Sequence, residues 1–281
     1  MLDEIFELDR DMNIISIKID KSDFEWEYKY KIVQKALSFV QKLCLKSIPK
    51  NRKKIYFSPF GDLNLLPLHA LSTPNDGYLI EQYEIVYIPF ISILDTFHSN
   101  QEIDKNLFVS IDEFQEESET CKNIEGVGGE HKIDMSATEF KSKIHNNPYN
   151  ILHLSTHGLS DLDNPLNSHL QFKNSDLSLL EIHALKLDIN LVVLSACETN
   201  LSTINGADEV LAFERAFLIA GAKNIMTTFL SVDSELTLDF MTVFYKKMNE
   251  TSSISSAFQR ACVEDIDNGS NEWMLFRFTG I

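Results

Sequence analysis

The stretches "NILHLSTHGLSD" (residues 150–161) and "NLVVLSACETN" (residues 190–200) decide the fold expected of this chain. Each begins with a short apolar run, which is typical of a strand buried inside a sheet. Each run ends in small polar residues followed by one reactive side chain, His157 in the first stretch and Cys197 in the second. Two buried strands that end in this way indicate a site at one edge of a parallel sheet.

Similar apolar runs recur along the chain and alternate with segments whose apolar residues have helical spacing. The predicted strands cover residues 13–20, 53–59, 83–89, 106–111, 149–155, 168–172, 189–196, 223–230 and 272–280. The predicted helices cover residues 24–46, 91–99, 136–145, 178–185, 206–222, 233–248 and 252–265, with a short helical turn in 60–71. This alternation predicts an α/β fold with a mostly parallel central sheet and helices on both faces.

One acidic segment interrupts the alternation. Residues 112–134 carry many acidic side chains and several glycines, with little apolar content before the glycines, so we expect an exposed, mobile loop there. The elements on both sides of this segment look like parts of one sheet. We therefore expect a single domain over residues 1–281, in which 53–59 is a buried strand and 13–20 an edge strand.

Composition excludes several classes of function. The formal net charge of -17 argues against direct binding to nucleic acid or to an anionic membrane. The four cysteines have no CxxC spacing, and the sequence contains no metal-binding His pair, GxGxxG or Walker loop, so no metal and no cofactor are expected. The acidic start is unlike a secretory signal, and no apolar run approaches the roughly 18 residues of a membrane span. We expect a cytoplasmic protein with reduced thiols.

The two strand ends suggest nucleophilic catalysis. The carboxyl ends of neighbouring parallel strands lie at one edge of a sheet, so His157 and Cys197 can converge there. A thiol beside an imidazole is the minimum for a cysteine nucleophile with a general base. Gly158 allows close approach of the backbone to a substrate, and the amides of Gly158 and Cys197 are candidate oxyanion donors.

His157 and Cys197 also have a purely structural interpretation. A single histidine at a strand end is usually a hydrogen-bonded structural residue, and a single cysteine after an apolar run is usually a small core residue. The equivalent positions of His157 and Cys197, with a glycine after the first, favour the catalytic interpretation. His153 lies inside its predicted strand, and we expect it to be packed in the core.

At this point the sequence resembles the CHAT-domain proteases, relatives of caspases and separases in peptidase clan CD. The paired motifs "ILHLSTHG" and "VVLSACET" carry the resemblance. It extends to "IYFSPFGDLNLLPLHAL", to "GADEVLAFERAFLIAGAKNIMTTFLSVDSELTLDFMTVFYKKM" and to "EWMLFRFTG", and so covers residues 50–281. Residues 1–49, with a predicted strand and helix, are less similar to the family.

The resemblance implies a caspase-like fold and a cysteine endopeptidase with His157 as base and Cys197 as nucleophile. Members of the family often carry helical repeats or belong to prokaryotic antiviral defence systems, where some are thought to cleave gasdermin-like or other effector proteins. The implied partners are therefore a protein substrate and an activating regulator, either a separate chain or the N-terminal segment. Two departures from the family pattern, Asn200 and the pair Phe229–Leu230, lie near expected substrate-facing loops.

Specificity follows weakly from two further residues. In related peptidases the residue two before the cysteine lines the primary pocket, and here it is Ser195, which favours an uncharged substrate side chain. Asp233 would favour a basic side chain if it lies near the same pocket, but an N-cap of the following helix is the commoner role for such a residue. Residues 198–206 are a candidate activation loop that orders on binding of a regulator.

Two alternatives to the peptidase stay open. The first is a catalytically silent caspase-like interaction module, against which the intact His157, Gly158 and Cys197 argue. The second is a small-molecule hydrolase that uses the same pair of residues. No cofactor or metal-binding motif in the sequence supports this alternative. The sequence therefore favours a cysteine endopeptidase acting on a specific protein substrate.

Overall fold

The computed structural model describes most of the chain from residue 52 onward. The described residues are 6–8, 14–17, 37, 52–59, 63–64, 66–73, 77–89, 105–159, 164, 167–195, 206–229 and 234–281. The helices predicted over 24–46 and 91–99 fall outside these residues, except that Leu37 is helical and buried. None of the described helices is long and apolar enough to span a bilayer.

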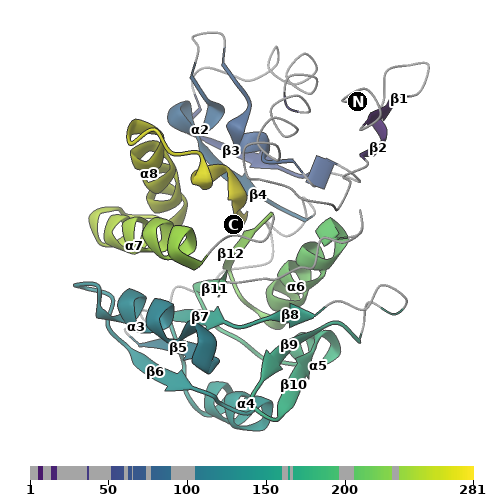
Figure 1. The fold of residues 1–281 in the computed structure, drawn as a ribbon, viewed down its shortest axis with the longest axis vertical. Helices are drawn as coiled ribbons and strands as arrows, with labels where there is room; N and C mark the ends of the chain where they lie inside the picture. The colour runs from purple at the N-terminus through teal and green to yellow at the C-terminus, as the bar shows by residue number, and fades with distance from the viewer. Residues whose placement is uncertain are drawn as a thin grey trace.

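The centre of the described structure is an eight-stranded sheet with the order β3-β4-β13-β12-β11-β7-β5-β6 (Figure 1). Its strands are β3 (Lys54–Phe57), β4 (Glu84–Tyr87), β5 (Asn106–Ser110), β6 (Glu130–Ile133), β7 (Ile151–Ser155), β11 (Leu191–Ser195), β12 (Asn224–Thr228) and β13 (Phe276–Gly280). All neighbours pair in parallel except β12 and β13, which are antiparallel. The predicted α/β class and the mostly parallel sheet are confirmed.

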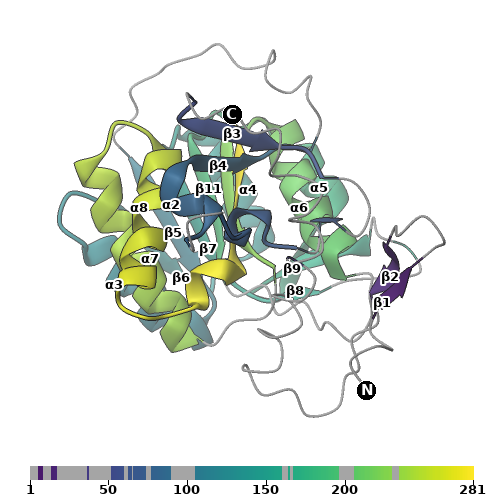
Figure 2. The same cartoon turned by 90° about the horizontal axis from the view of Figure 1, so that it is seen from above.

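Helices cover both faces of this sheet (Figure 2). One face packs against α3 (Gln115–Asn123), α7 (Ser234–Glu250) and α8 (Ile254–Asp267), and the other against α4 (Ala137–Asn146), α5 (Leu179–His183) and α6 (Gly206–Ala220). The remaining helical elements are η4 (Leu68–Ala70), α2 (Leu79–Gln82), η6 (Asp112–Phe114) and η8 (Glu272–Leu275). The central strands β5, β7 and β11 are buried along their whole length because their side chains alternate between two buried layers.

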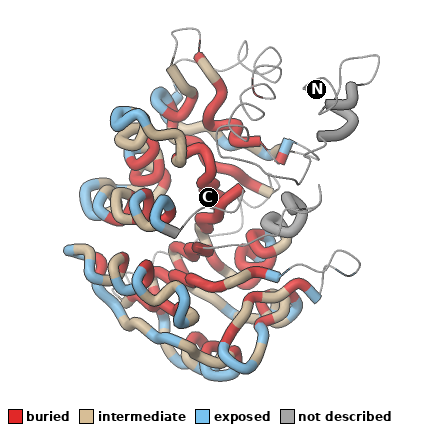
Figure 3. The backbone as a smooth tube through the Cα atoms, in the orientation of Figure 1, coloured by how far each residue is buried: buried red, intermediate tan, exposed pale blue. Residues whose placement is uncertain are grey.

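Strand β11 shows this alternation directly. Leu191 and Val193 belong to the apolar cluster under α7 and α8, whereas Val192 and Leu194 belong to the cluster under α4, α5 and α6. All five residues of β11 are buried, and Figure 3 shows buried residues along the central strands. A strand buried on both sides cannot slip by one residue without exchanging its two packed faces, so its register is well defined.

Two smaller sheets complete the described strands. β8 (Gly158–Leu159), β9 (His169–Phe172) and β10 (Ser175–Ser178) form an antiparallel sheet, and β1 (Phe6–Leu8) pairs with β2 (Ile14–Ile17). The strand predicted over 13–20 is therefore confirmed, but in a separate two-stranded sheet. β1, β8 and β10 were not predicted: β1 and β8 are too short for a periodic pattern, and β10 has Leu177 as its one apolar residue.

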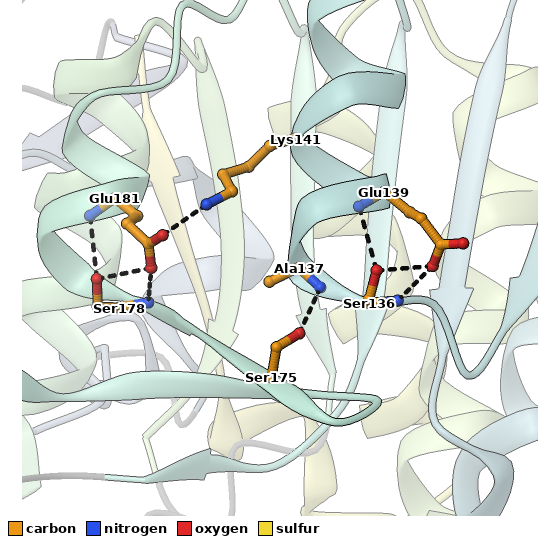
Figure 4. A network of polar contacts seen from close by, with 7 residues as sticks. All are labelled: Ser136, Ala137, Glu139, Lys141, Ser175, Ser178 and Glu181. Carbon is orange, nitrogen blue, oxygen red and sulfur yellow. Dashed lines mark hydrogen bonds and ion pairs between the residues drawn. The ribbon is translucent and has the colours of Figure 1, made fainter.

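The helices beside β10 begin at capping boxes (Figure 4). Ser136 and Glu139 cap α4, as their sequence spacing predicts, and Ser178 and Glu181 cap α5 in the same way. Lys141 of α4 forms an ion pair with Glu181, with 2.5 Å between Nζ and Oε1. These contacts join α4 to α5 at the end of the three-stranded sheet.

The predicted loop over residues 112–134 was wrong. This segment contains η6, α3 and β6, and its residues 124–129 form the only long connection. The buried face of α3 consists of Glu117, Ser118 and Cys121, which are polar or small. A search for apolar periodicity does not detect a helix that packs through such residues.

The strand predicted over 53–59 was correct in place but wrong in burial. β3 is an edge strand of the described sheet, its residues are only partly buried, and the side chain of Tyr56 is 39% exposed. Its isoleucine and phenylalanine suggested a central strand, but an edge strand has a neighbour on one side only.

A buried ion pair joins α6 to β13 of the central sheet. Glu214 of α6 and Arg277 of β13 are 1% and 2% exposed, with 3.2 Å between Oε1 and Nε. The hydroxyls of Thr227 and Thr279 donate to the same carboxylate at 2.6 and 3.0 Å. The Arg277 guanidinium also stacks 4.1 Å above the centre of the Tyr87 ring. The charges are thus desolvated but paired and hydrogen-bonded, as buried charges must be.

We expect Arg277→Met to lower the free energy of unfolding by about 3–5 kcal/mol, because it leaves the Glu214 carboxylate buried without its cation. The double variant Glu214→Leu/Arg277→Met removes both charges and should recover most of this loss. Urea denaturation measures both, with the exposed Glu250→Ala as the control. A single variant no less stable than Glu250→Ala would contradict this account of the pair.

Candidate active site at the carboxyl edge of the sheet

The register of three central strands defines the candidate site. Ser110 of β5 pairs with Ser155 of β7, and Ser155 pairs with Ser195 of β11. The three strands are parallel and end at the same level, so the segments that follow them leave the same edge of the sheet. His157 and Cys197 each come two residues after this row of serines. Cys197 lies outside the described residues, as do all of 196–205.

His157 is held from the side by the segment that follows β5. Its Nε2 lies 3.0 Å from Oε2 of Glu113, in η6. The ring of Phe114 meets the imidazole edge to face, with 4.9 Å between centroids and 69° between planes. The His157 side chain is 16% exposed and that of Glu113 is 66% exposed. The imidazole is thus mostly covered, and its carboxylate partner lies at the surface.

The backbone N–H of Gly158 takes no part in the pairing of β8 with β9. Gly158 is buried in β8 and is paired with Leu170 of β9. The Gln171 N–H donates to the His157 carbonyl at 2.8 Å, which makes Gly158 and Leu170 a non-hydrogen-bonded pair. In such a pair the N–H groups point away from the partner strand, so the Gly158 N–H points away from β9.

Of the two predicted specificity residues, Ser195 belongs to the described structure and Asp233 does not. Ser195 ends β11 and is 1% exposed, and its hydroxyl makes no hydrogen bond within the part of the chain that the structure describes. Asp233, like Asn200 and Leu230, lies outside the described residues. The predicted proximity of Asp233 to Ser195 therefore falls outside the described residues.

His153 is a core residue, as predicted, and belongs to a buried polar network under the site. It is fully buried, with Nδ1 2.8 Å from the Tyr245 hydroxyl and Nε2 3.2 Å from Oε1 of Glu117. Nε2 also lies 3.0 Å from the hydroxyl of Ser155, which is hydrogen-bonded to Ser118 at 2.8 Å. This network joins β7 to α3 and α7.

Sequence reasoning missed Glu113 and Phe114 as neighbours of His157. Both lie in the acidic segment that was predicted to be a loop. The sequence did contain an indication, because both residues follow the predicted strand over 106–111. Residues that follow parallel strands lie at the carboxyl edge of the sheet, and this holds for that strand as it does for the strand before His157. Predicting the contact with His157 would also have required the strand order, which places β5 beside β7.

The two cysteines in the described part of the chain are too deeply buried to act as nucleophiles. Cys121 and Cys262 are fully buried and not in disulfides, and burial raises the pKa of both thiols. A buried thiol with a raised pKa stays protonated and unreactive at neutral pH. Neither is therefore a candidate nucleophile, and Cys44 lies outside the described residues. No described cluster of His, Cys, Asp and Glu has the three members that would hold a metal ion.

Comparisons with known proteins agree with this architecture. The model of the CHAT domain family matches residues 32–272. A chain of the Saccharomyces cerevisiae separase–securin complex at 2.6 Å resolution is similar in fold, with a TM-score of 0.55 and 12% identity over 92% of this chain and 18% of that chain. The complex at 3.0 Å gives a TM-score of 0.52 and 12% identity over 81% of this chain and 15% of that chain. The chain thus spans less than a fifth of these relatives. No curated protein matches.

Burial predicts which thiols react. We expect Cys121 and Cys262 to resist alkylation by iodoacetamide in the folded protein, because both are buried and protonated. After unfolding in denaturant both should be alkylated at the rate of a free thiol. Mass spectrometry of digested protein measures each site. Alkylation of either cysteine in native buffer at its unfolded rate would contradict the packing described for α3 or α8.

Proposed function

Because this chain belongs to the CHAT-domain family, we propose that it is a cysteine endopeptidase of the caspase-like kind, with His157 as base and Cys197 as nucleophile. One observation carries the proposal. β7 and β11 are neighbours in register through Ser155 and Ser195, and each continues for two residues to one member of the pair. Side chains that leave adjacent parallel strands at equal distance past their ends can meet over the same edge.

The proposed reaction follows from these two residues. His157 removes the thiol proton of Cys197, and the thiolate attacks the carbonyl carbon of the scissile peptide bond. The C–N bond then breaks as His157 returns the proton to the leaving amine. Water hydrolyses the resulting thioester, again with His157 as base, and restores the thiol.

The proposed oxyanion site consists of the amides of Gly158 and Cys197. The orientation of the Gly158 N–H supports its part, since this group points away from β9 and follows His157 directly. Fixed donors of this kind act on the charge that develops in the transition state, and removal of one typically costs about 2.7–4 kcal/mol of barrier.

The proposed substrate is a specific protein, such as a gasdermin-like or other effector in prokaryotic antiviral defence, and a separate regulator would activate the cytoplasmic enzyme. Resemblance to the family supports this finer proposal. Ser195 would line the primary pocket beside an uncharged side chain, and Asp233 is the alternative that would select a basic one. The substrate's cleavage site discriminates between them.

A catalytically silent interaction module is the second candidate. The similar solved structures are of separase bound to securin, so a related fold does form a complex with a protein partner. This candidate predicts binding of a partner without any cleavage that depends on Cys197.

We expect the purified chain to cleave members of a proteome-derived peptide library in reducing buffer, and Cys197→Ala to abolish this cleavage. The matched control is Cys121→Ala, which removes a buried thiol that takes no part in the reaction and should leave cleavage intact. Mass spectrometry of the products gives the residue before the cut. Cleavage that survives in Cys197→Ala would overturn the proposal. Silence of all three proteins would favour either the interaction module or an enzyme that is inactive without its regulator.

We expect Gly158→Val to lower kcat by about 10²–10³, because a side chain at this position obstructs the approach of the substrate carbonyl to the amide. The neighbouring Leu159→Val is the matched control, since Leu159 is 44% exposed and its side chain has no role in the reaction. Normal turnover in a folded Gly158→Val protein would remove Gly158 from the mechanism.

A further inference from the structure

Two Glu–His contacts of equal spacing join the segment after β5 to β7. Glu113 and Glu117 are four residues apart, and they contact His157 and His153, which are also four residues apart. The first contact lies at the surface beside the candidate site and the second is buried beneath it. We propose that Glu113 is the positioning residue of His157. The buried contact between Glu117 and His153 holds α3 in the position that lets Glu113 reach His157. This inference rests on the proposed function.

The buried contact anchors the beginning of α3. Glu117 is 4% exposed and Ser118 is fully buried, and each is hydrogen-bonded to a residue of β7, His153 or Ser155. α3 also packs against β5, β6 and α7, so together with β7 four elements hold it (Figure 1). Oε2 of Glu117 makes no hydrogen bond within the described residues, but a shift of α3 would leave further buried polar groups unpaired, so the network has few alternative arrangements.

The surface contact is set by this anchor. η6 runs directly into α3 without an intervening residue, so the position of Glu113 follows from that of Glu117 one turn later. Oε2 of Glu113 then lies 3.0 Å from Nε2 of His157, while the ring of Phe114, beside it, packs against the imidazole in a T-shaped arrangement. Two consecutive residues of η6 thus restrain the imidazole, one by a polar contact and the other by packing of its ring.

The division of roles between the ring nitrogens follows. A carboxylate accepts a hydrogen bond from N–H, so Glu113 favours the tautomer that carries its proton on Nε2. Nδ1 is then the nitrogen that takes the proton of the Cys197 thiol and later gives it to the leaving amine. The carboxylate also stabilises the imidazolium formed in between, in the way that a third residue supports a nucleophile and its base in other hydrolases.

Exposure separates this role from a structural one. An ion pair with a carboxylate that is 66% exposed contributes little to stability, because solvent screens it. Loss of Glu113 should therefore leave the fold intact and affect only the orientation of the imidazole. A residue with a structural role would instead change the midpoint of unfolding.

The kinetic test compares Glu113→Ala with Glu116→Ala, an exposed glutamate in the next turn of the same acidic segment. We expect Glu113→Ala to lower kcat by about ten- to a hundredfold, which is part of the roughly 10²–10⁴ that general acid–base catalysis supplies, with KM changed less than about twofold. Glu113→Gln, which can still accept from Nε2–H, should retain more activity than Glu113→Ala. Equal kcat values for Glu113→Ala and Glu116→Ala would overturn the proposal.

A spectroscopic test does not depend on cleavage. In protein labelled with ¹⁵N-histidine and carrying Cys197→Ala, the imidazole shifts of His157 at alkaline pH report its tautomer, and His157→Gln assigns the signal. We expect the Nε2–H tautomer with Glu113 present and a mixture in Glu113→Ala, with Glu116→Ala as the control. An unchanged tautomer would overturn the role of Glu113. Cleavage that survives in Cys197→Ala would instead overturn the proposed function, while the tautomer still decides whether Glu113 orients the ring.

Discussion

The in-register parallel pairing of β5, β7 and β11 is the constraint on which the rest of the structure depends. Ser110, Ser155 and Ser195 form one row across these strands, so the segments that carry Glu113, His157 and Cys197 leave the sheet from the same level. The register itself is held by apolar side chains that alternate between two packed layers. Packing that has no chemical role therefore determines where the chemical groups can meet.

Polar groups buried under this edge add precision to the packing. His153 and Glu117 lie where apolar side chains would serve stability equally well, and each must be hydrogen-bonded to avoid a desolvation cost. Glu214 and Arg277 follow the same rule on the other side of the sheet and hold α6, the helix that begins after the segment containing Cys197. Both networks restrict the relative positions of elements that border the candidate site.

Much of this arrangement was predictable from the sequence, for identifiable reasons. β5, β7, β11 and β12 are apolar on both faces, and the capping box of Ser136 and Glu139 marks the start of α4, so these elements were predicted correctly. α3 was missed because its buried face is formed by polar and small residues, which apolar periodicity cannot detect. The contact of Glu113 with His157 depends on which strands are neighbours, and that order is a property of the folded sheet. The proximity of His157 and Cys197 stays a prediction, supported by register and by family membership.

The rate at which Cys197 is alkylated at mildly acidic pH tests the central claim most directly, because a free thiol is almost unreactive there while a thiolate paired with an imidazolium reacts. Iodoacetamide labelling of Cys197 would be followed by mass spectrometry in the parent protein and in His157→Gln. Rapid alkylation in the parent protein and slow alkylation in His157→Gln are the predicted results. Equal rates in the two proteins would contradict a functional pair of His157 and Cys197.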